Sequence, residues 1–414
     1  MEMHVIKTYA MSFLHELVSD KKRLLTEQEA ESLAAANSAL QQADAVVICL
    51  GGKAGRMGES VVGTGLLESM LLALKHTGKA GTPVNIIVDE GIVELFAERL
   101  YQEKYWPHIT VRPATNLQDS TAMMGEQVQG KHVLVVDFHG AHDDMPSLQS
   151  EQDVRPDGRT ITTLAHLFRV GVRSYAQRGP ERRYADFVED LFGLPQGVID
   201  GRQAQPTILL SSADETRYPI LASEFGLDGE ATQIICFFQS VVPAKCYCRW
   251  DEVLMMLCEH FAQHFPGKKL DFLLACGPDA SVPDGIRKAD LEADFQGFTG
   301  VNNNAHVLVR ATPSLRDLAI LTRHAMLALS NDTGPGHIAG ALHIPTITPY
   351  LPGNIYSKNI WSSTLWHHGI TLEPNPFSFR QIEAAILWDK TDIIDSIPPE
   401  NLLQEALRCL PGEA

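Results

Sequence analysis

The chain has 414 residues, more than a single hydrophobic core usually serves, so two domains are expected. Its composition of 44% hydrophobic and 21% charged residues is typical of a soluble globular protein, and the formal net charge of −17 argues against a nucleic-acid binder. With no apolar run near the roughly 20 residues that span a bilayer, no signal-peptide layout and scattered cysteines, we expect a cytoplasmic protein without a transmembrane segment.

The first half of the chain alternates helical stretches with short apolar runs. Residues 1–44 are expected to be helical, because Leu24–Leu40 is rich in Ala, Glu, Gln and Leu. Strands are predicted in AVVICLGG (45–52), PVNIIVD (83–89), ITVRPA (109–114) and HVLVVDF (132–138), with helices over Leu66–Lys75 and IVELFAERLYQEKY (92–105). Alternation of this kind predicts an α/β domain with a parallel sheet.

The same pattern starts again near Thr207. Strands are predicted in QIICFFQS (233–240), DFLLACG (271–277), HVLVRA (306–311), MLALSND (326–332) and PTITPY (345–350), with helices over 251–265 and 315–325. We therefore predict two Rossmann-like domains, 1–205 and 206–374, whose facing strand ends form a ligand-binding cleft. Residues 375–414 are predicted to form a helical tail that packs back on the N-terminal domain.

The strongest motif is LALSNDTGPGHIAGALHIPTITPY (327–350). A strand runs into a glycine-rich loop, and a helix is expected to begin near His337. The N–H groups of such a loop and helix N-terminus suit a diphosphate. Thr333 would add a hydroxyl donor, and His337 a donor or a positive charge. The residues alone equally allow an ordinary strand–helix turn in which Asp332 caps the helix.

NDTGPGHIAGALHIP (331–345) resembles the donor-binding signature of the heptosyltransferase family, the ninth glycosyltransferase family, whose members have the GT-B fold. TPSLRDLAILTRHA (312–325) is similar to the helix that precedes this signature in the family. The resemblance implies an N-terminal acceptor domain and a C-terminal donor domain. It also implies that the phosphates of a nucleotide sugar are lined by Asp332, Thr333, Gly334, Pro335, Gly336 and His337.

A second stretch, FFQSVVPAKCYCRWDEVLMML (237–257), is similar to the family's segment around a phosphate-binding lysine, which Lys245 matches, with Tyr247 at the usual Trp position. A lysine there would neutralise the charge of the leaving diphosphate, a role otherwise met by a metal ion, and Ser240 would bind the same phosphates. No cofactor or metal is therefore expected. From the residues alone, Lys245 is also compatible with a surface lysine.

Two further stretches resemble the family with departures. GRMGESVVGTGLLESML (55–71) is similar to its acceptor motif, with Glu59 in place of the Asp that acts as general base and Gly65 in place of Pro. Without the resemblance, Glu59 would be an acid that complements a helix N-terminus. LLACGPDASVP (273–283) resembles a ribose-binding turn, where Ala280 occupies the usual Glu position and the adjacent Asp279 is the candidate.

The acceptor site has weaker candidates. Arg56 would contact an anionic group or remain a flexible loop charge, and Asp137 and His139 follow a strand that would face the acceptor. The run VVDFHGAHDDM (135–145) also allows a plain loop, or a metal site made of Asp137, His139, His142 and Asp143. Such metal sites need a second run of aspartates, which the sequence lacks, so no metal is expected.

These features favour an inverting, metal-independent glycosyltransferase that moves a sugar from a nucleoside-diphosphate donor to a hydroxyl group of a saccharide, glycolipid, protein or small molecule. ADP-heptose is the donor that the resemblance implies. The alternatives are a nucleotide-sugar epimerase or hydrolase of the same fold, and a catalytically silent nucleotide-sugar-binding protein. The segment 155–183 is rich in arginine. It could form a solvated surface that is balanced by acids, or it could form an anion-binding face. Peripheral contact with a membrane is also left open.

Overall fold

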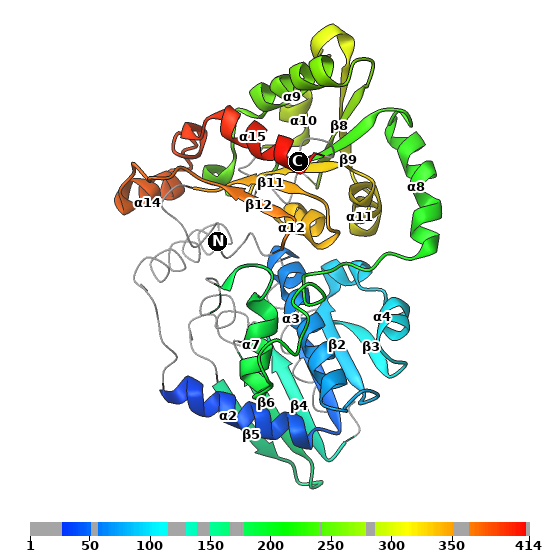
Figure 1. Ribbon diagram of the computed structural model, residues 1–414, viewed down its shortest axis with the longest axis vertical. Coiled ribbons are helices and arrows are strands. Elements are labelled where there is room, and N and C mark those ends of the chain that lie inside the picture. Colours follow the sequence, from blue (N-terminus) through cyan, green and yellow to red (C-terminus); the bar gives the residue numbers. More distant parts are fainter. Residues whose placement is uncertain are drawn as a thin grey trace. The chain divides into compact units, whose positions relative to one another are not determined.

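The computed structural model describes residues 27–50, 57–114, 130–138, 149–165, 167, 175, 178–240, 242–278, 286–351 and 364–410. The chain divides into two compact units, with Lys22–Ser211 in the first and Ser212–Ala414 in the second. Each unit contains one six-stranded sheet with helices packed around it (Figure 1). The sequence predicts the boundary between residues 205 and 206, six residues before this position.

The N-terminal unit has the strand order β3-β2-β1-β4-β6-β5, in which β5 alone is antiparallel to its neighbour. Helix α2 packs against α7 and the strands β4, β5 and β6, and α3 packs against α7. The elements are α2 (Glu27–Gln42), β1 (Ala45–Cys49), α3 (Met57–His76), β2 (Val84–Asp89), η1 (Glu90–Leu95), α4 (Glu98–Lys104), β3 (Ile109–Ala114), β4 (His132–Asp137), β5 (Gln149–Val154), β6 (Thr160–Ala165) and α7 (Arg183–Phe192).

The C-terminal unit has the order β12-β11-β10-β7-β8-β9, with every pair parallel. Its elements are α8 (Ser212–Phe225), β7 (Thr232–Phe237), η3 (Pro243–Lys245), α9 (Trp250–His264), β8 (Leu270–Cys276), α10 (Lys288–Asp294), η5 (Val301–Asn303), β9 (Ala305–Ala311), α11 (Leu315–Arg323), β10 (Leu327–Ser330), α12 (Gly334–Ala341), β11 (Thr346–Pro349), β12 (His367–Ile370), α14 (Phe379–Leu387), η6 (Ile394–Ser396) and α15 (Pro399–Cys409).

Both sheets change direction at a topological switch point. In the N-terminal unit the first strand, β1, lies between β2 and β4, and in the C-terminal unit β7 lies between β8 and β10. The chain therefore winds first to one side of the starting strand and then to the other. In open parallel sheets, ligands bind beyond the carboxyl ends of the strands at this point. Each unit thus offers one such edge, between β1 and β4 or between β7 and β10.

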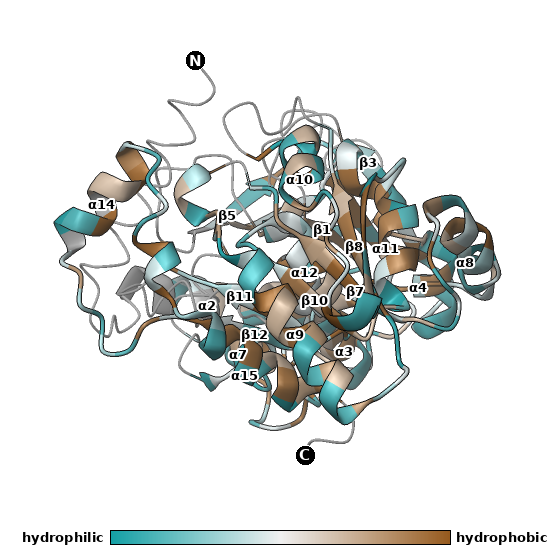
Figure 2. Cartoon of the chain, turned by 90° about the horizontal axis from the view of Figure 1, so that it is seen from above, coloured by the Kyte–Doolittle hydropathy of each residue, from teal (hydrophilic) through white to brown (hydrophobic). Residues whose placement is uncertain are grey.

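Apolar strands explain why the sheets form. Every residue of β1, β8 and β10 is buried, as expected for central strands covered on both faces. Figure 2 shows the hydrophobic colour following β1 and β8, whereas α8 carries mostly hydrophilic residues. Helix α3 is long and apolar enough to cross a membrane, but 78% of its most apolar window is buried inside the protein, as in a core helix of a soluble unit.

Three strands escape prediction from the sequence. β5 (QSEQDV) is polar because its edge position leaves its exposed side in water, and β12 begins with two histidines. β6 (TITTLA) carries three threonines, which weaken its apolar signal. All three lie at or beside a sheet edge, where the hydrophobic pattern of buried parallel strands no longer applies.

The tail differs from its prediction. We expect a helical tail on the N-terminal domain, but α15 packs against α9, β11 and β12 of the C-terminal unit, and α14 packs against η3. The physical reason is the apolar face of the tail: Ile393, Ile394, Ile397 and Leu402 are buried in the same hydrophobic cluster as the residues of α9. Helical structure is confirmed for 379–387 and 399–409.

Candidate functional site

Two loops leave the switch point of the C-terminal sheet. β7 and β10 are neighbours in the sheet, with Leu327 paired to Ile234 and Ser330 to Phe237. The chain after β7 leads to η3, and the chain after β10 leads to α12. Because both strands are parallel, these two loops emerge at the same edge. The structure therefore brings together the two stretches that carry the predicted donor residues.

Lys245 and Asp332 meet across these loops. Lys245 ends the 3-10 turn η3, and its Nζ lies 2.5 Å from Oδ2 of Asp332. The lysine side chain is 33% exposed and the aspartate 9%, so the ammonium group is held in place while remaining accessible to a ligand. The ion pair with the carboxylate holds the ammonium group in one orientation. The partly exposed, ion-paired lysine is compatible with phosphate binding and with the alternative of a surface lysine.

Asn331 connects the loop after β7 with the loop after β10 through hydrogen bonds. Its side chain is fully buried, and its Oδ1 accepts hydrogen bonds from the backbone N–H of Tyr247, at 3.1 Å, and from the indole Nε1 of Trp250, at 3.0 Å. Its Nδ2 donates to the carbonyl oxygen of Phe238, at 2.6 Å. These three bonds tie the end of β7 and the segment after Lys245 to the residue that precedes Asp332. The sequence analysis missed Asn331, although it stands inside the quoted motif.

Helix α12 begins at Gly334, three residues before the predicted start at His337. Thr333 is the N-cap, and its side chain makes no capping hydrogen bond. Asp332 therefore does not cap the helix, because its carboxylate pairs with Lys245 instead. The positive end of the α12 dipole and the Thr333 hydroxyl lie directly after the ion-paired Asp332, an arrangement suited to a phosphate group.

Gly336 allows α12 to start this close to the strand. A Cβ atom at this position would lie 2.5 Å from Oγ and 3.0 Å from Cβ of Ser330, the last residue of β10. Pro335 in the first turn lacks the N–H that a helix start would leave unpaired. The glycine-rich motif therefore has a steric reason: the turn between β10 and α12 is too tight for a larger side chain.

His337 is a neutral imidazole near neutral pH. Burial lowers its pKa to about 4, the nearby Asp332 opposes this shift, and Lys245 adds to it. Of the two predicted roles, the positive charge is therefore wrong at pH 7, and a neutral hydrogen-bonding group is what the structure supports. Its ring lies 5.2 Å, centroid to centroid, from the buried His367 of β12, which bonds through Nε2 to Thr348 Oγ1 at 2.9 Å.

The end of β7 supplies two more polar side chains. Ser240 is buried, and its Oγ accepts a hydrogen bond from the N–H of Val242 at 3.3 Å, which leaves its own hydroxyl hydrogen to donate. Gln239, which the sequence analysis missed, accepts from the N–H of Gly277 at 2.8 Å. Its buried Nε2 has no hydrogen-bond partner among the residues that the structure describes, so it can donate to a ligand. Asp279, the predicted ribose residue, lies outside the described residues.

The N-terminal unit places Glu59 in the first turn of α3, half-buried. The next residue, Ser60, donates from Oγ to the carbonyl oxygen of Leu50 at 3.0 Å, which fixes this helix start beside the end of β1. Thr64 has a structural role: its Oγ1 accepts from the N–H of Thr207 at 2.9 Å and so joins α3 to the segment before the unit boundary.

Gly65, where the resembled family has Pro, is explained by packing. A Cβ here would lie 2.7 Å from the ring of Tyr184 and 2.9 Å from Cδ of Pro206.

Asp137 ends β4 opposite Cys49, the last residue of β1, and is buried. Because Glu59 follows β1, both acids belong to the carboxyl edge at the switch point of the N-terminal sheet. Burial and the neighbouring Asp137 raise the pKa of the Cys49 thiol. The other acceptor candidates, Arg56 and His139, lie outside the described residues, as do His142 and Asp143 of the metal alternative.

Three arginines in the described part of the arginine-rich segment form ion pairs with acids. Arg155 pairs with Asp153 at 2.8 Å and Arg159 with Asp157 at 2.7 Å. Arg182 pairs with Asp186 and Glu189 at 2.7 and 2.8 Å. Within the part of the segment that the structure describes, these pairs favour an acid-balanced surface over an anion-binding face.

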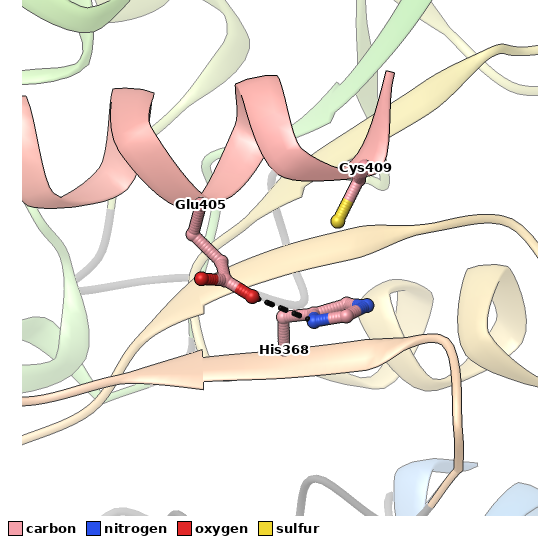
Figure 3. A group of neighbouring side chains, drawn as sticks. All are labelled: His368, Glu405 and Cys409. Carbon is pink, nitrogen blue, oxygen red and sulfur yellow. Dashed lines mark hydrogen bonds and ion pairs between the residues drawn. The ribbon is translucent and has the colours of Figure 1, made fainter. Parts of the chain in front are cut away.

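One group of metal-ligating side chains lies outside the donor loops. His368 of β12 and Glu405 and Cys409 of α15 bring potential ligand atoms within 4.8 Å of one another (Figure 3). Glu405 accepts from His368 Nδ1 and from Arg408 Nη1, both at 2.9 Å. The carboxylate is thus already paired on both oxygens, and the group connects the last helix to the edge strand of the sheet.

Comparison with known proteins places this site in a family context. Residues 168–363 match the model of Glycosyltransferase family 9 (heptosyltransferase). The glycosyl transferase family 9 structure from Veillonella parvula DSM 2008 has 17% identity and a TM-score of 0.56, covering 88% of this chain and 96% of that chain. ADP-heptose lps heptosyltransferase II from E. coli has 13% identity and a TM-score of 0.52, covering 88% and 98%. A comparison with curated protein sequences gave no match.

The matched segment contains both donor loops, from Lys245 to His337. The predicted resemblance to the heptosyltransferases is thereby confirmed. At these low identities the structural similarity shows the fold, and the predicted GT-B fold, with one Rossmann-like sheet in each unit, is confirmed as well.

Proposed function

We propose that this chain, a glycosyltransferase by its family match, is an inverting, metal-independent enzyme that moves a sugar from a nucleoside diphosphate to a hydroxyl acceptor. The observation that carries the proposal is the Lys245–Asp332 pair at the switch point, next to the N-terminus of α12. A fixed cation and a helix N-terminus at one strand edge are suited to a diphosphate. The expected donor is ADP-heptose, the nucleotide sugar after which the similar E. coli heptosyltransferase is named.

The donor half of the reaction uses the C-terminal unit. Lys245, the Thr333 hydroxyl and the first turn of α12 hold the two phosphates, with Ser240 and Gln239 as further donors. As the bond between the anomeric carbon and the phosphate oxygen breaks, negative charge grows on the departing diphosphate. Lys245 stabilises that charge in the place where other enzymes use a divalent cation. His337, being neutral, contributes a hydrogen bond and no charge.

The acceptor half uses the N-terminal unit. Glu59 takes the proton from the acceptor hydroxyl while the hydroxyl oxygen attacks the anomeric carbon from the face opposite the diphosphate. One bond forms and one breaks in the same displacement, so the configuration at the anomeric carbon inverts. The acceptor class that we propose is a hydroxyl-bearing saccharide, glycolipid, protein or small molecule, met in the cytoplasm.

The test follows ADP-heptose in the presence of the full chain. ADP release is measured without acceptor and with an oligosaccharide, a glycolipid vesicle or a serine-rich peptide, and products are checked by mass. A transferase releases ADP only with an acceptor that gains the mass of the sugar. ADP release without acceptor identifies a hydrolase, an isomerised donor identifies an epimerase, and binding without turnover on any acceptor identifies a silent binding protein. Each of these three outcomes contradicts the proposal.

A matched variant separates the two halves of the site. Glu59→Gln removes the base on the N-terminal unit and leaves the donor residues of the C-terminal unit unchanged, so ADP-heptose affinity should stay within about twofold of wild type while transfer falls by roughly 100-fold or more. Unchanged transfer by this variant would remove Glu59 from the mechanism.

A further inference from the structure

The C-terminal tail makes direct hydrogen bonds to the segment that follows Lys245. Oδ1 of Asp395 accepts from the N–H of Cys248 at 2.7 Å, and the carbonyl oxygen of Ile397 accepts from the Tyr247 hydroxyl at 2.9 Å. Both tail residues are about 150 positions away in the sequence. The Asp395 bond is exposed, whereas the Tyr247 bond is buried.

Apolar packing surrounds the same segment. Val242 and Ala244, which precede Lys245, share a buried cluster with Ile393, Ile394 and Ile397 of the tail. Helix α14 also packs against η3, the turn that Lys245 ends. The backbone on both sides of the lysine is therefore held by tail residues, in addition to the bond from Tyr247 N–H to Asn331.

The far end of the tail is anchored to the sheet. In Figure 3 the Glu405 carboxylate of α15 reaches the imidazole of His368 on β12, and the Cys409 thiol points from the end of the helix toward the same ring. Arg408 satisfies the second carboxylate oxygen. With α15 held in this way, the η6 turn directly before it has a fixed position relative to the donor loops.

We propose that the C-terminal tail is a positioning element of the donor site, in which Asp395 and the carbonyl of Ile397 hold the backbone that presents Lys245 to the diphosphate. This inference rests on the proposed function, because it assigns a purpose to the tail only if Lys245 binds the donor. Lys245 needs such support because its side chain, with a four-carbon stem, is flexible. Among the described residues Asp332 is the partner of its ammonium group, so its reach depends on a rigid backbone.

Asp395 and Tyr247 are positioning residues, since neither is placed in contact with the phosphates. Three variants test them by calorimetric titration with ADP on the full chain: Asp395→Ala, Tyr247→Phe and Asp395→Asn. The first two remove one bond each and should weaken ADP binding roughly 5- to 20-fold. Asp395→Asn keeps an Oδ1 acceptor for the Cys248 N–H and should bind ADP within about twofold of wild type. Gln404→Ala, at an exposed position of α15, is the matched control and should also bind normally.

A double-mutant cycle distinguishes positioning of Lys245 by the tail from a general structural role of the tail. If Asp395 acts through Lys245, then Lys245→Ala combined with Asp395→Ala should bind ADP no more weakly than Lys245→Ala alone. Fully additive losses would overturn the proposal, because Asp395 would then act independently of the lysine. So would wild-type affinity in Asp395→Ala and Tyr247→Phe when Lys245→Ala loses binding. If wild type itself binds no ADP, the proposed function fails first, which is a distinguishable result.

Discussion

At the residue scale, Asn331 organises the donor loops more than any residue that the motif alone singles out. It satisfies a buried backbone N–H, a buried indole N–H and a backbone carbonyl at once. Asn331→Ala leaves these groups unpaired and should lower the free energy of unfolding by about 2–4 kcal/mol. Urea unfolding measures the change. Asn375→Ala is the control, because Asn375 is exposed and its hydrogen bonds within the described part of the chain go to nearby Phe377. Equal stability of the two variants would contradict this role.

The buried His337 makes stability depend on pH in a defined window. In the folded protein its pKa is lowered to about 4 from an ordinary 6.5, chiefly by burial. Between these values the unfolded chain binds more protons than the folded one, so the free energy of unfolding falls as the pH drops from 6.5 toward 4. The full effect of this one group is about 3 kcal/mol.

The measurement compares urea unfolding of wild type and His337→Gln at pH 7.5, 6 and 4.5. Wild type should lose more stability than the variant on acidification, because glutamine does not titrate. His367 is present in both proteins, so its own contribution largely cancels. Parallel stability profiles would show that His337 is not held neutral by burial.

Short motifs in the sequence single out candidate residues, but they do not reveal residues whose hydrogen-bond partners are distant in the chain. Lys245, Asp332 and His337 are identified by short patterns, and the structure brings all three to one edge. Gln239 and Asn331 are missed because their hydrogen-bond partners are 38 to 93 positions away in the sequence, which no local pattern contains. The sequence leaves the charge of His337 open between a hydrogen-bond donor and a cation, since burial is a property of the packed fold.

At the element scale, the start of α12 is set by a single close contact. Gly336→Ala would place a methyl group 2.5 Å from Ser330 Oγ, so the helix start must shift away from β10. We expect a loss of about 1–3 kcal/mol in unfolding free energy and weaker ADP binding, because the first turn of α12 moves with it. Gly229→Ala, with nothing within 4 Å of the added atom, is the control. Unchanged ADP affinity in Gly336→Ala would contradict a role for this helix start.

Elements buried on both faces could be predicted from their residues, whereas edge elements could not. The sequences of β1, β8 and β10 are continuous apolar runs, because central strands of a parallel sheet are covered by helices on both faces. β5 and β12 lie at sheet edges, where polar residues are tolerated, and their sequences resemble loops. The tail helices were expected from composition, but which unit they join depends on the match between their isoleucines and the cluster around α9.

At the scale of the whole molecule, we propose that the N-terminal unit acts on the acceptor and the C-terminal unit binds the donor. The two sheets each offer a switch-point edge, one bearing Glu59 and Asp137 and the other Lys245 and Asp332. The α/β pattern occurs twice in the sequence and predicts two parallel sheets, because alternating strands and helices form a parallel sheet flanked by helices. The sequence does not contain the relation between the tail and the donor loop, which arises only when residues 150 positions apart pack together.

The most direct test is calorimetric titration of wild type and Lys245→Ala with ADP, UDP, GDP and ADP-heptose. Losing a phosphate-binding lysine should cost on the order of 1.5–3 kcal/mol of binding free energy, a drop of roughly 10- to 150-fold in affinity. Lys269→Ala is the matched control, since Lys269 also pairs with an aspartate but lies elsewhere in the same unit. Selective binding of ADP and ADP-heptose that Lys245→Ala loses and Lys269→Ala keeps is the predicted result. Binding of none of these ligands by wild type, or equal affinity in Lys245→Ala, would contradict the donor site.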